Sequence, residues 1–352
     1  MTLQNRKRIP WIDIAKCIAI FLVVLGHTLR GGVIQKIIYS FQVTAFFWLS
    51  GMTCKVKDIK TQIKNDFLRI MIPYYCFGII SMLIFAFLGS FAADHLELSV
   101  DTSLKDSIFE LLLASSQGDR LKFNLPLWFL PCLFTTKIIY YAIYKLVRGN
   151  QKTVLLSGVI LAALGFLYTY LQGPVLPFNL SISLKMFVFF SLGRSFYLWS
   201  QNNEHRLSNR VKNIAIGVIL LMITALIAIF APKINYARDR FPSVLGFLLT
   251  SLTGSLGICF VSMGIKSKWM EYVGKATLAV LVMHKFPVLL FQTVGPQKTL
   301  LTQYDSVLCV IIAVLIAIVS IALCLVCERI ILRFFPFLLG DFSFFSKKKN
   351  RQ

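Results

Sequence analysis

The sequence alternates between long apolar stretches and short polar segments. Ten of these stretches contain about 20 mostly apolar residues, the length that an α-helix needs to cross the hydrocarbon core of a bilayer. The predicted spans cover residues 10–29, 34–53, 70–91, 126–147, 153–171, 182–200, 213–231, 244–263, 276–295 and 306–327. The pattern predicts an all-α fold, a polytopic membrane helix bundle. Residues 1–352 are expected to form one integral-membrane domain without an appended soluble domain.

The composition favours a membrane protein over a soluble one. Of the 352 residues, 57% are hydrophobic and 15% are charged, and the mean hydropathy is +0.73. Soluble domains are usually about half apolar and about a quarter charged. The formal net charge of +22 does not indicate nucleic-acid binding, because most basic residues lie between the apolar spans. Membrane lipids are therefore expected partners, and nucleic acid is not.

The distribution of Lys and Arg predicts the orientation of the spans. With a cytoplasmic N-terminus, the cytoplasmic segments contain 24 of these residues and the external segments contain 10. Because cytoplasmic loops are enriched in Lys and Arg, both termini are predicted to be cytoplasmic. Within the external loop 92–125, the segment SLKDSIFELLLASS has helical periodicity and is expected to lie along the membrane surface. The segment KVKDIKTQIKNDFLR is expected to be amphipathic and cytoplasmic.

The cysteines do not indicate a metal site. Most of them lie inside apolar spans, and their spacing is not that of metal ligands. The one CxxC pair, Cys324 and Cys327, lies in a run of Leu, Val and Ala. We interpret the cysteines as small apolar packing residues and expect no metal.

Three ionisable residues, Asp13, Lys16 and His27, lie in the first apolar span. At about 100° per residue, Lys16 and His27 lie within about 20° of the same helical face, and Asp13 lies about 40° from His27. Charged groups at membrane depth are costly and are usually functional. The first span therefore carries a polar stripe along about half of its length.

His27 and Asp13 of this stripe each have two interpretations. His27 has an unperturbed pKa near neutrality, which suits a general base that takes a proton from a hydroxyl. Alternatively, His27 forms a structural hydrogen bond with a neighbouring helix. Asp13 either pairs with Lys16 three residues later or helps to shape a polar cavity.

Two arginines lie at the predicted cytoplasmic ends of spans. Arg69, in FLRIMIPYY, begins the third span, and Arg194, in SLGRSFY, lies near the inner end of the sixth. The guanidinium group binds phosphates in a bidentate manner, so both are candidates for cofactor binding. The alternative is that they are ordinary residues of the positive cytoplasmic face.

A second polar element lies in LAVLVMHKFPVLL, where His284 and Lys285 precede Pro287. Proline is expected to break or kink the helix, and breaks at membrane depth are tolerated where neighbours or water satisfy the backbone. His284 and Lys285 therefore either face a polar cavity or form a packed interhelical hydrogen bond.

Lys137, in LFTTKIIYY, lacks a local partner and receives no role. Ser50 and Gly51, in FFWLSGM, are interpreted as packing residues rather than as a nucleophilic site.

These segments together resemble the membrane acyltransferase-3 family, which includes bacterial O-acetyltransferases of cell-surface glycans. Lys16 and His27 match the family's basic residue, ten intervening residues and histidine, and Asp13 fits its upstream acidic position. FFWLSG resembles the end of the family's second span, and Lys64 and Arg69 resemble its basic entry to the third. LPLWFLPCLF, which contains Trp128, is similar to a segment of its sugar O-acetylase branch, and YVGKATLAVLVMH is similar to the family's late span, which often ends in histidine. Many family members have Arg where this chain has Lys16.

The resemblance implies an enzyme of the bacterial cytoplasmic membrane. It implies transfer of an acyl group, expected to be acetyl, from cytoplasmic acetyl-CoA to a hydroxyl of a cell-surface carbohydrate or lipid-linked glycan. The residues expected to act fall into three groups: His27, Asp13 and Lys16 in catalysis, Arg69, Lys16 and Arg194 in acyl-CoA binding, and His284, Lys285 and Trp128 in acceptor binding. A homodimer is compatible with the sequence. The alternative is a transporter or flippase of lipid-linked sugars, which also has about ten spans and buried charges.

Overall fold

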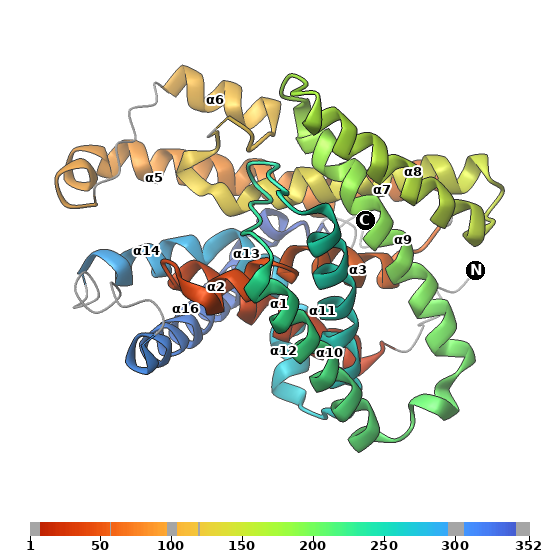
Figure 1. Cartoon of the computed structure of the whole chain (residues 1–352). Coiled ribbons are helices and arrows are strands. Elements are labelled where there is room, and N and C mark those ends of the chain that lie inside the picture. The colour runs from red at the N-terminus through yellow and green to blue at the C-terminus, as the bar shows by residue number, and fades with distance from the viewer. Residues whose placement is uncertain (1–7, 57, 97–103, 119, 295–305, 343–352) are drawn as a thin grey trace, which may run out of the picture.

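The computed structural model describes residues 8–56, 58–96, 104–118, 120–294 and 306–342. These residues form a bundle of helices without β-strands, apart from one isolated bridge between Asn235 and Arg240 (Figure 1). The all-α prediction is confirmed. The external loop predicted at 92–125 is described only in part, because residues 97–103 and 119 lie outside these ranges.

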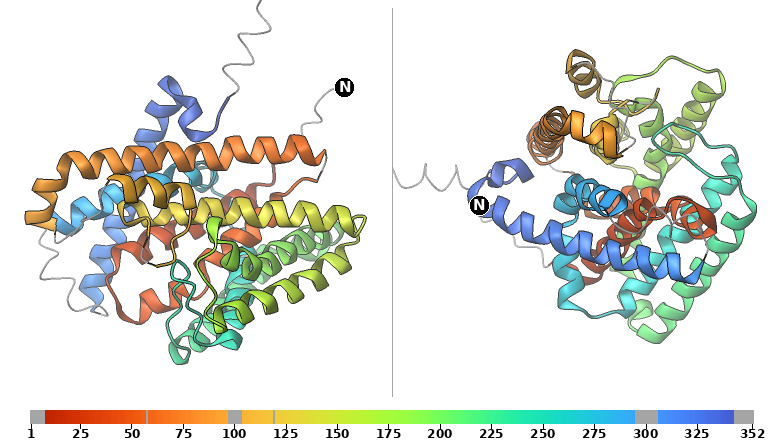
Figure 2. Two further views of the ribbon diagram at one scale, coloured as in Figure 1. Left: turned by 90° about the horizontal axis from the view of Figure 1, so that it is seen from above. Right: turned by 90° about the vertical axis from the view of Figure 1, so that its left-hand side faces the viewer.

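The helices of the first half are α1 (Pro10–Thr28), α2 (Gly32–Tyr39), α3 (Gln42–Thr53), α4 (Ile59–Asp66), α5 (Ile72–Leu96), α6 (Leu104–Leu113), α7 (Phe129–Leu146) and α8 (Gln151–Tyr170). The second half contains α9 (Leu180–Asn202), α10 (Arg210–Phe230), α11 (Val244–Gly264), α12 (Lys268–Lys275), α13 (Thr277–Met283), α14 (Lys285–Val294) and α16 (Val307–Phe334). Short helical turns include η1 (Phe67–Met71), η2 (Lys122–Trp128), η3 (Pro177–Asn179), η4 (Glu204–Leu207) and η5 (Pro336–Leu339). In Figure 2, the long orange helix α5 and the yellow helix α7 run nearly side by side across the molecule.

The ten apolar stretches all form helices, but three of them do not form one long apolar helix. By length and composition, seven helices within the described residues suffice to cross a membrane. Helix α9 has 23 residues but contains five serines and two charged residues, Lys185 and Arg194. The stretches 34–53 and 276–295 are each broken into two short helices, α2 with α3 and α13 with α14. The chain is thus a multi-pass membrane helix bundle with two discontinuous segments.

The break between α2 and α3 occurs at Ser40 and Phe41. It frees the Ser40 carbonyl oxygen, which accepts hydrogen bonds from the Tyr236 hydroxyl at 3.0 Å and the Thr250 hydroxyl at 3.2 Å. Irregular backbone at membrane depth requires such internal partners, because no water is available there. The break therefore depends on side chains from the α10–α11 connection and from α11.

Helix α1 lies at the centre of the bundle. It packs against α2, α3, α11, α12, α13, α14 and α16. Of the 18-residue apolar stretch in α1, 67% is buried inside the protein, whereas only 22% is buried in the corresponding stretches of α8 and α10. The exposed side chains of α10 include Ile219, Met222, Leu226 and Phe230, an apolar surface that suits contact with lipid. A polar stripe on α1 consequently faces protein, not lipid.

Glycines bring several helices into close contact. A Cβ atom on Gly51 of α3 would lie 1.9 Å from the Phe190 carbonyl oxygen, and one on Gly193 of α9 would lie 2.0 Å from the Trp48 carbonyl oxygen. The two backbones approach so closely that neither position accepts a side chain. The interpretation of Gly51 as a packing residue is confirmed.

Candidate active site

The polar stripe of α1 begins with a carboxylate held between two cations. Asp13 is buried, and its carboxylate oxygens lie 3.6 Å from Lys16 Nζ and 3.6 Å from Arg8 Nε. The predicted pairing of Asp13 with Lys16 three residues later is confirmed. The cations compensate the buried charge of Asp13, which is therefore tolerated beside an apolar interior, and the Arg8 side chain remains largely exposed.

Close packing of α12 holds this end of α1 in place. A Cβ atom on Gly274 would lie 1.8 Å from the Asp13 carbonyl oxygen. Only glycine permits this approach. Gly274 therefore brings the YVGKATLAVLVMH segment, which the resemblance singled out, against the acidic end of the stripe.

His27 lies at the opposite end of α1, where two other helices hold the backbone. The Gly26 carbonyl oxygen accepts hydrogen bonds from Tyr39 Oη at 3.0 Å and Gln35 Nε2 at 3.0 Å, both from α2. The His27 carbonyl oxygen accepts one from Gln292 Nε2 of α14 at 3.0 Å. These bonds satisfy carbonyls that the end of a helix leaves free. The last turn of α1 is thereby fixed against α2 and α14.

The His27 ring lies beside a second imidazole. Its centroid is 5.2 Å from that of His284 and 6.1 Å from the Tyr39 ring. His284 occupies the break between α13 and α14, as the position of Pro287 predicted. Proline has no N–H to donate to the Met283 carbonyl four residues earlier, and α13 ends at that residue.

Hydrogen bonding within α13 fixes the His284 ring. Its Nδ1 lies 2.9 Å from both the Val280 and the Leu281 carbonyl oxygens. Since a carbonyl only accepts, Nδ1 carries the proton and Nε2 has the free lone pair. His284 is fully buried, and its Nε2 has no hydrogen-bond partner among the described residues. A second proton acceptor therefore lies next to His27.

A small cavity of about 40 Å³ opens beside His27. Its polar lining comes from His27, Gln42 and Trp128. The remaining lining residues are apolar: Val23, Val43, Phe46, Pro126, Phe129 and Leu281. Elements far apart in the sequence, namely α1, α3, η2 and α13, thus converge on one histidine.

Hydrogen bonds to buried asparagines hold the segment that carries Trp128. Asn179 Nδ2 donates to the Trp128 carbonyl oxygen at 3.2 Å, and Asn124 Nδ2 donates to the Val282 carbonyl oxygen at 3.1 Å. Lys285 Nζ donates to the Lys122 carbonyl oxygen at 2.6 Å and lies over the Phe85 ring. Lys285 therefore braces η2 and is not among the residues that line the His27 cavity.

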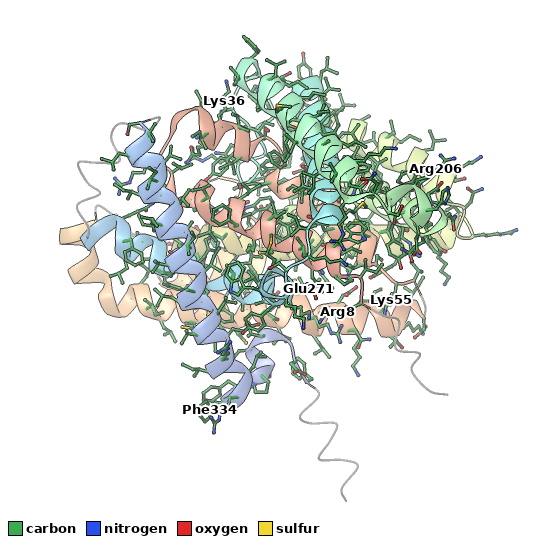
Figure 3. All side chains as sticks on the ribbon, turned by 90° about the horizontal axis from the view of Figure 1, so that it is seen from below. Arg8, Lys36, Lys55, Arg206, Glu271 and Phe334 are labelled. Atoms are coloured by element: carbon green, nitrogen blue, oxygen red, sulfur yellow. The ribbon has the colours of Figure 1, made fainter. Side chains whose placement is uncertain are left out.

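A much larger polar cavity, of about 730 Å³, lies at the beginning of α1. Three basic residues, Arg8, Arg69 and Lys275, line it together with the acidic residues Glu328 and Asp341. Figure 3 shows Arg8 and Lys55 in the lower half of the view and Lys36 of α2, near the other end of α1, at the upper edge. We call the cavity of about 730 Å³ the basic cavity. From Pro10, where α1 begins close to Arg8, to His27 the helix extends for about 26 Å at about 1.5 Å per residue.

A π-helical turn presents Arg69 to the basic cavity. The turn, η1, follows α4 and precedes α5. Asp66 at its start accepts hydrogen bonds from Lys137 Nζ at 2.5 Å and Tyr141 Oη at 2.6 Å. Such turns are rare and often occur at functional sites. Lys137, which received no role from sequence, pins the turn that carries Arg69.

Arg194 and Lys16 do not line the basic cavity. Arg194 Nη1 donates to the Cys54 carbonyl oxygen at 3.1 Å, and the guanidinium group lies over the Tyr197 ring. Lys16 is held at Asp13. The structure brings Arg69 to the cavity but leaves Arg194 beside the end of α3. Arg8 and Lys275, which sequence reasoning treated only as topology signals, take its place.

Sequence reasoning also missed a buried ion pair outside these cavities. Lys185 of α9 is fully buried, and its Nζ lies 2.6 Å from an Asp239 carboxylate oxygen. Thr169 and Ser181 hydroxyls donate to the same carboxylate at 2.9 Å. This cluster attaches the α10–α11 connection to α8 and α9. Within the described residues, no group of three His, Cys, Asp or Glu side chains is arranged to hold a metal ion.

Comparison with known proteins assigns the chain to a family. The family model described as an acyltransferase domain, that of the acyltransferase 3 family, matches residues 9–329. No curated protein and no solved structure is significantly similar to the chain. The match covers Asp13, Lys16 and His27, the lining of the His27 cavity and nearly every helix described above, whereas Arg8 and the lining residues of the basic cavity from Leu332 onward lie outside it. The chain therefore belongs to the acyltransferase 3 family and is a membrane acyltransferase.

Proposed function

We propose that the protein transfers an acetyl group from cytoplasmic acetyl-CoA to a hydroxyl of an extracytoplasmic carbohydrate or lipid-linked glycan. The observation that carries the proposal is the position of His27. It lines a cavity at one end of the central helix, about 26 Å of helix away from the basic cavity at the other end. This arrangement suits a donor and an acceptor that enter from opposite sides of a bacterial cytoplasmic membrane.

The basic cavity suits the phosphates of CoA. Arg8, Arg69 and Lys275 outnumber the two acidic residues that line it. Arginine forks bind phosphate oxygens in pairs, and a lysine adds a point charge. We assign binding of the CoA phosphates to Arg69, because Arg69 lies in η1 and lines the cavity, and Asp66 anchors the start of this turn.

Helix α13 connects the two cavities. Leu278 and Ala279 line the basic cavity, and Leu281 lines the His27 cavity. The pantetheine arm of CoA would run along this helix to bring the thioester to His27. Holding donor and acceptor in one site supplies the orientation that a bimolecular reaction otherwise lacks.

His27 is the proposed general base. In a direct transfer it takes the proton of the acceptor hydroxyl while the hydroxyl oxygen bonds to the acyl carbon. The carbon–sulfur bond then breaks, and CoA leaves as a thiolate that is protonated to the thiol. An acyl-histidine intermediate is the alternative route, in which His27 first receives the acyl group. Asp13 and Lys16 would set the electrostatic potential along the donor's path.

The transporter alternative makes the opposite prediction about covalent chemistry. A flippase of lipid-linked sugars moves an intact substrate and cleaves no thioester. Membership of an acyltransferase family favours the enzyme.

The test is incorporation of label from radioactive acetyl-CoA supplied to the cytoplasmic face of membrane vesicles. Wild type is expected to label a glycan or glycolipid fraction, and His27→Ala is not. Absence of thioester cleavage by wild type, with the full glycolipid pool of the native envelope as acceptor, would favour the transporter.

A further inference from the structure

Gln42, the first residue of α3, carries a buried polar group that the fold does not use. The residue is 4% exposed and lines the His27 cavity. Its Oε1 has no hydrogen-bond partner among the described residues. A buried acceptor without a partner costs about 1–3 kcal/mol. At the wall of a cavity, a ligand is the natural source of the missing donor.

Gln35, in the neighbouring helix α2, has an amide group that is fully hydrogen-bonded within the protein. Gln35 of α2 donates from Nε2 to the Gly26 carbonyl at 3.0 Å and also to the Leu29 carbonyl. Its Oε1 accepts a hydrogen bond from Lys233 Nζ at 2.6 Å. Both ends of Gln35 are thus occupied by the protein, whereas Gln42 Oε1 has no hydrogen-bond partner among the described residues.

Two buried polar atoms near His27 accept hydrogen bonds and have no donor among the described residues. Gln42 Oε1 is an acceptor, and His284 Nε2 is one because its Nδ1 carries the proton. A neutral His27 that acts as base offers a third. A ligand that satisfies these atoms must bring hydrogen-bond donors, as neighbouring hydroxyl groups do.

We propose that Gln42 recognises a second hydroxyl of the acceptor, adjacent to the hydroxyl that is acylated. This inference rests on the proposed function and narrows its acceptor to a sugar with neighbouring free hydroxyls. One hydroxyl gives its proton to His27 and forms the new bond to the acyl carbon, as CoA leaves as its thiol. The neighbouring hydroxyl keeps its proton and donates it to Gln42 Oε1.

The size and remaining lining of the cavity agree with one edge of a sugar ring. A volume of about 40 Å³ is more than one water requires and less than a whole monosaccharide. Trp128 offers an aromatic surface to the apolar C–H groups of such a ring. Gln42 is therefore a specificity-determining residue, separate from the base.

The test compares two reactions of the same enzyme in proteoliposomes. Transfer is measured with labelled acetyl-CoA and the glycolipid fraction of the native envelope, and hydrolysis is measured as CoA thiol release without glycolipid. Gln42→Met keeps the shape of the side chain but removes the amide. It is expected to lower kcat/KM for the glycolipid by roughly 10- to 100-fold, since about 1.4 kcal/mol corresponds to tenfold. The KM for acetyl-CoA and the hydrolysis rate are expected to stay within about twofold.

Two further variants separate recognition from folding. Gln42→Asn retains a neutral amide on a shorter side chain and is expected to keep more of the transfer activity than Gln42→Met. Gln201→Met makes the same substitution as the test variant at an exposed position in α9 and is expected to behave as wild type. Equal loss of transfer and hydrolysis in Gln42→Met, or no loss of either, would overturn the inference.

A chemical arm tests whether the two hydroxyls are adjacent. Periodate cleaves the carbon–carbon bond between neighbouring hydroxyls, so pretreatment of the glycolipid is expected to abolish incorporation by wild type. Undiminished incorporation would overturn the inference while leaving the acyltransferase proposal intact. Absence of any thiol release by wild type would instead overturn the proposed function, and this inference with it.

Discussion

The rings of His27 and His284 lie 5.2 Å apart, centroid to centroid, although the two residues come from opposite ends of the chain. One closes the last turn of α1, and the other occupies the break between α13 and α14. The Nδ1 proton of His284 is bound to carbonyl groups of its own helix, so Nε2 remains an acceptor next to His27, which lines the same cavity as Gln42. Both a transfer reaction and its acceptor specificity can be tested at these positions.

Substitution His27→Ala is expected to abolish acyl transfer, because no other group in the cavity replaces the base at its position. A loss of at least about 100-fold is expected, in the range of general-base catalysis. Expression and membrane insertion should be unchanged, since α1 keeps its apolar faces. His205→Ala, at an exposed position in η4, is the matched control. Normal turnover by His27→Ala would remove the assignment of the base.

Substitution Arg69→Ala is expected to raise the KM for acetyl-CoA about 10-fold with little change in kcat, because it removes a phosphate contact made equally before and during the reaction. Initial rates over a range of acetyl-CoA concentrations provide the measurement. Arg206→Ala, which changes an exposed arginine of η4, serves as the control (Figure 3). If Arg69→Ala keeps the wild-type KM, Arg69 is an ordinary residue of the positive face.

The same measurement on Arg194→Ala decides the second arginine prediction. Its guanidinium group is bound to the Cys54 carbonyl and is not in the basic cavity. We therefore expect an unchanged KM for acetyl-CoA together with a lower melting temperature in detergent. A raised KM would instead support the role in acyl-CoA binding that the sequence suggested.

Substitution Pro287→Ala is expected to lower kcat about 10-fold. Alanine supplies the N–H that Pro287 lacks, so the Met283 carbonyl gains a donor and α13 can continue into α14. The His284 ring would then lose its fixed position beside His27. Pro174→Ala, at an exposed position between α8 and α9, should leave kcat unchanged. Wild-type kcat in Pro287→Ala would show that the break is not needed for turnover.

Substitution Gly274→Ala is expected to destabilise the protein by about 1–3 kcal/mol, because the new Cβ would lie 1.8 Å from the Asp13 carbonyl oxygen. Thermal unfolding in detergent is the measurement. Gly78→Ala is the comparison, since its Cβ would meet only the movable end of the Leu111 side chain. Similar melting temperatures for both variants would contradict the close contact of α1 with α12.

Substitution of one partner of the Asp66–Lys137 pair is expected to cost about 3 kcal/mol, because it leaves a largely buried charge uncompensated. Combining Lys137→Met with Asp66→Asn removes both charges and keeps an acceptor for Tyr141. The double variant should be more stable than either single one in thermal unfolding. Strict additivity of the two effects would show that the ions do not interact.

The sequence by itself determined the class of fold and the central polar helix. Apolar stretches of span length must form helices in a bilayer, because only internal hydrogen bonds satisfy the backbone there. The Asp13–Lys16 pair is equally local, since residues three apart share a helical face. The break at His284 followed from Pro287, which acts on the residues just before it.

The tertiary structure decided which distant groups meet. No local pattern marks the break between α2 and α3, because its free carbonyl is satisfied by Tyr236 and Thr250. Lys137 forms an ion pair with Asp66, and Arg194 binds the Cys54 carbonyl at the end of α3 and does not line the basic cavity. The sequence did not predict that Gln42 Oε1 lacks a hydrogen-bond partner among the described residues, because the partners of a buried polar group are set by tertiary packing.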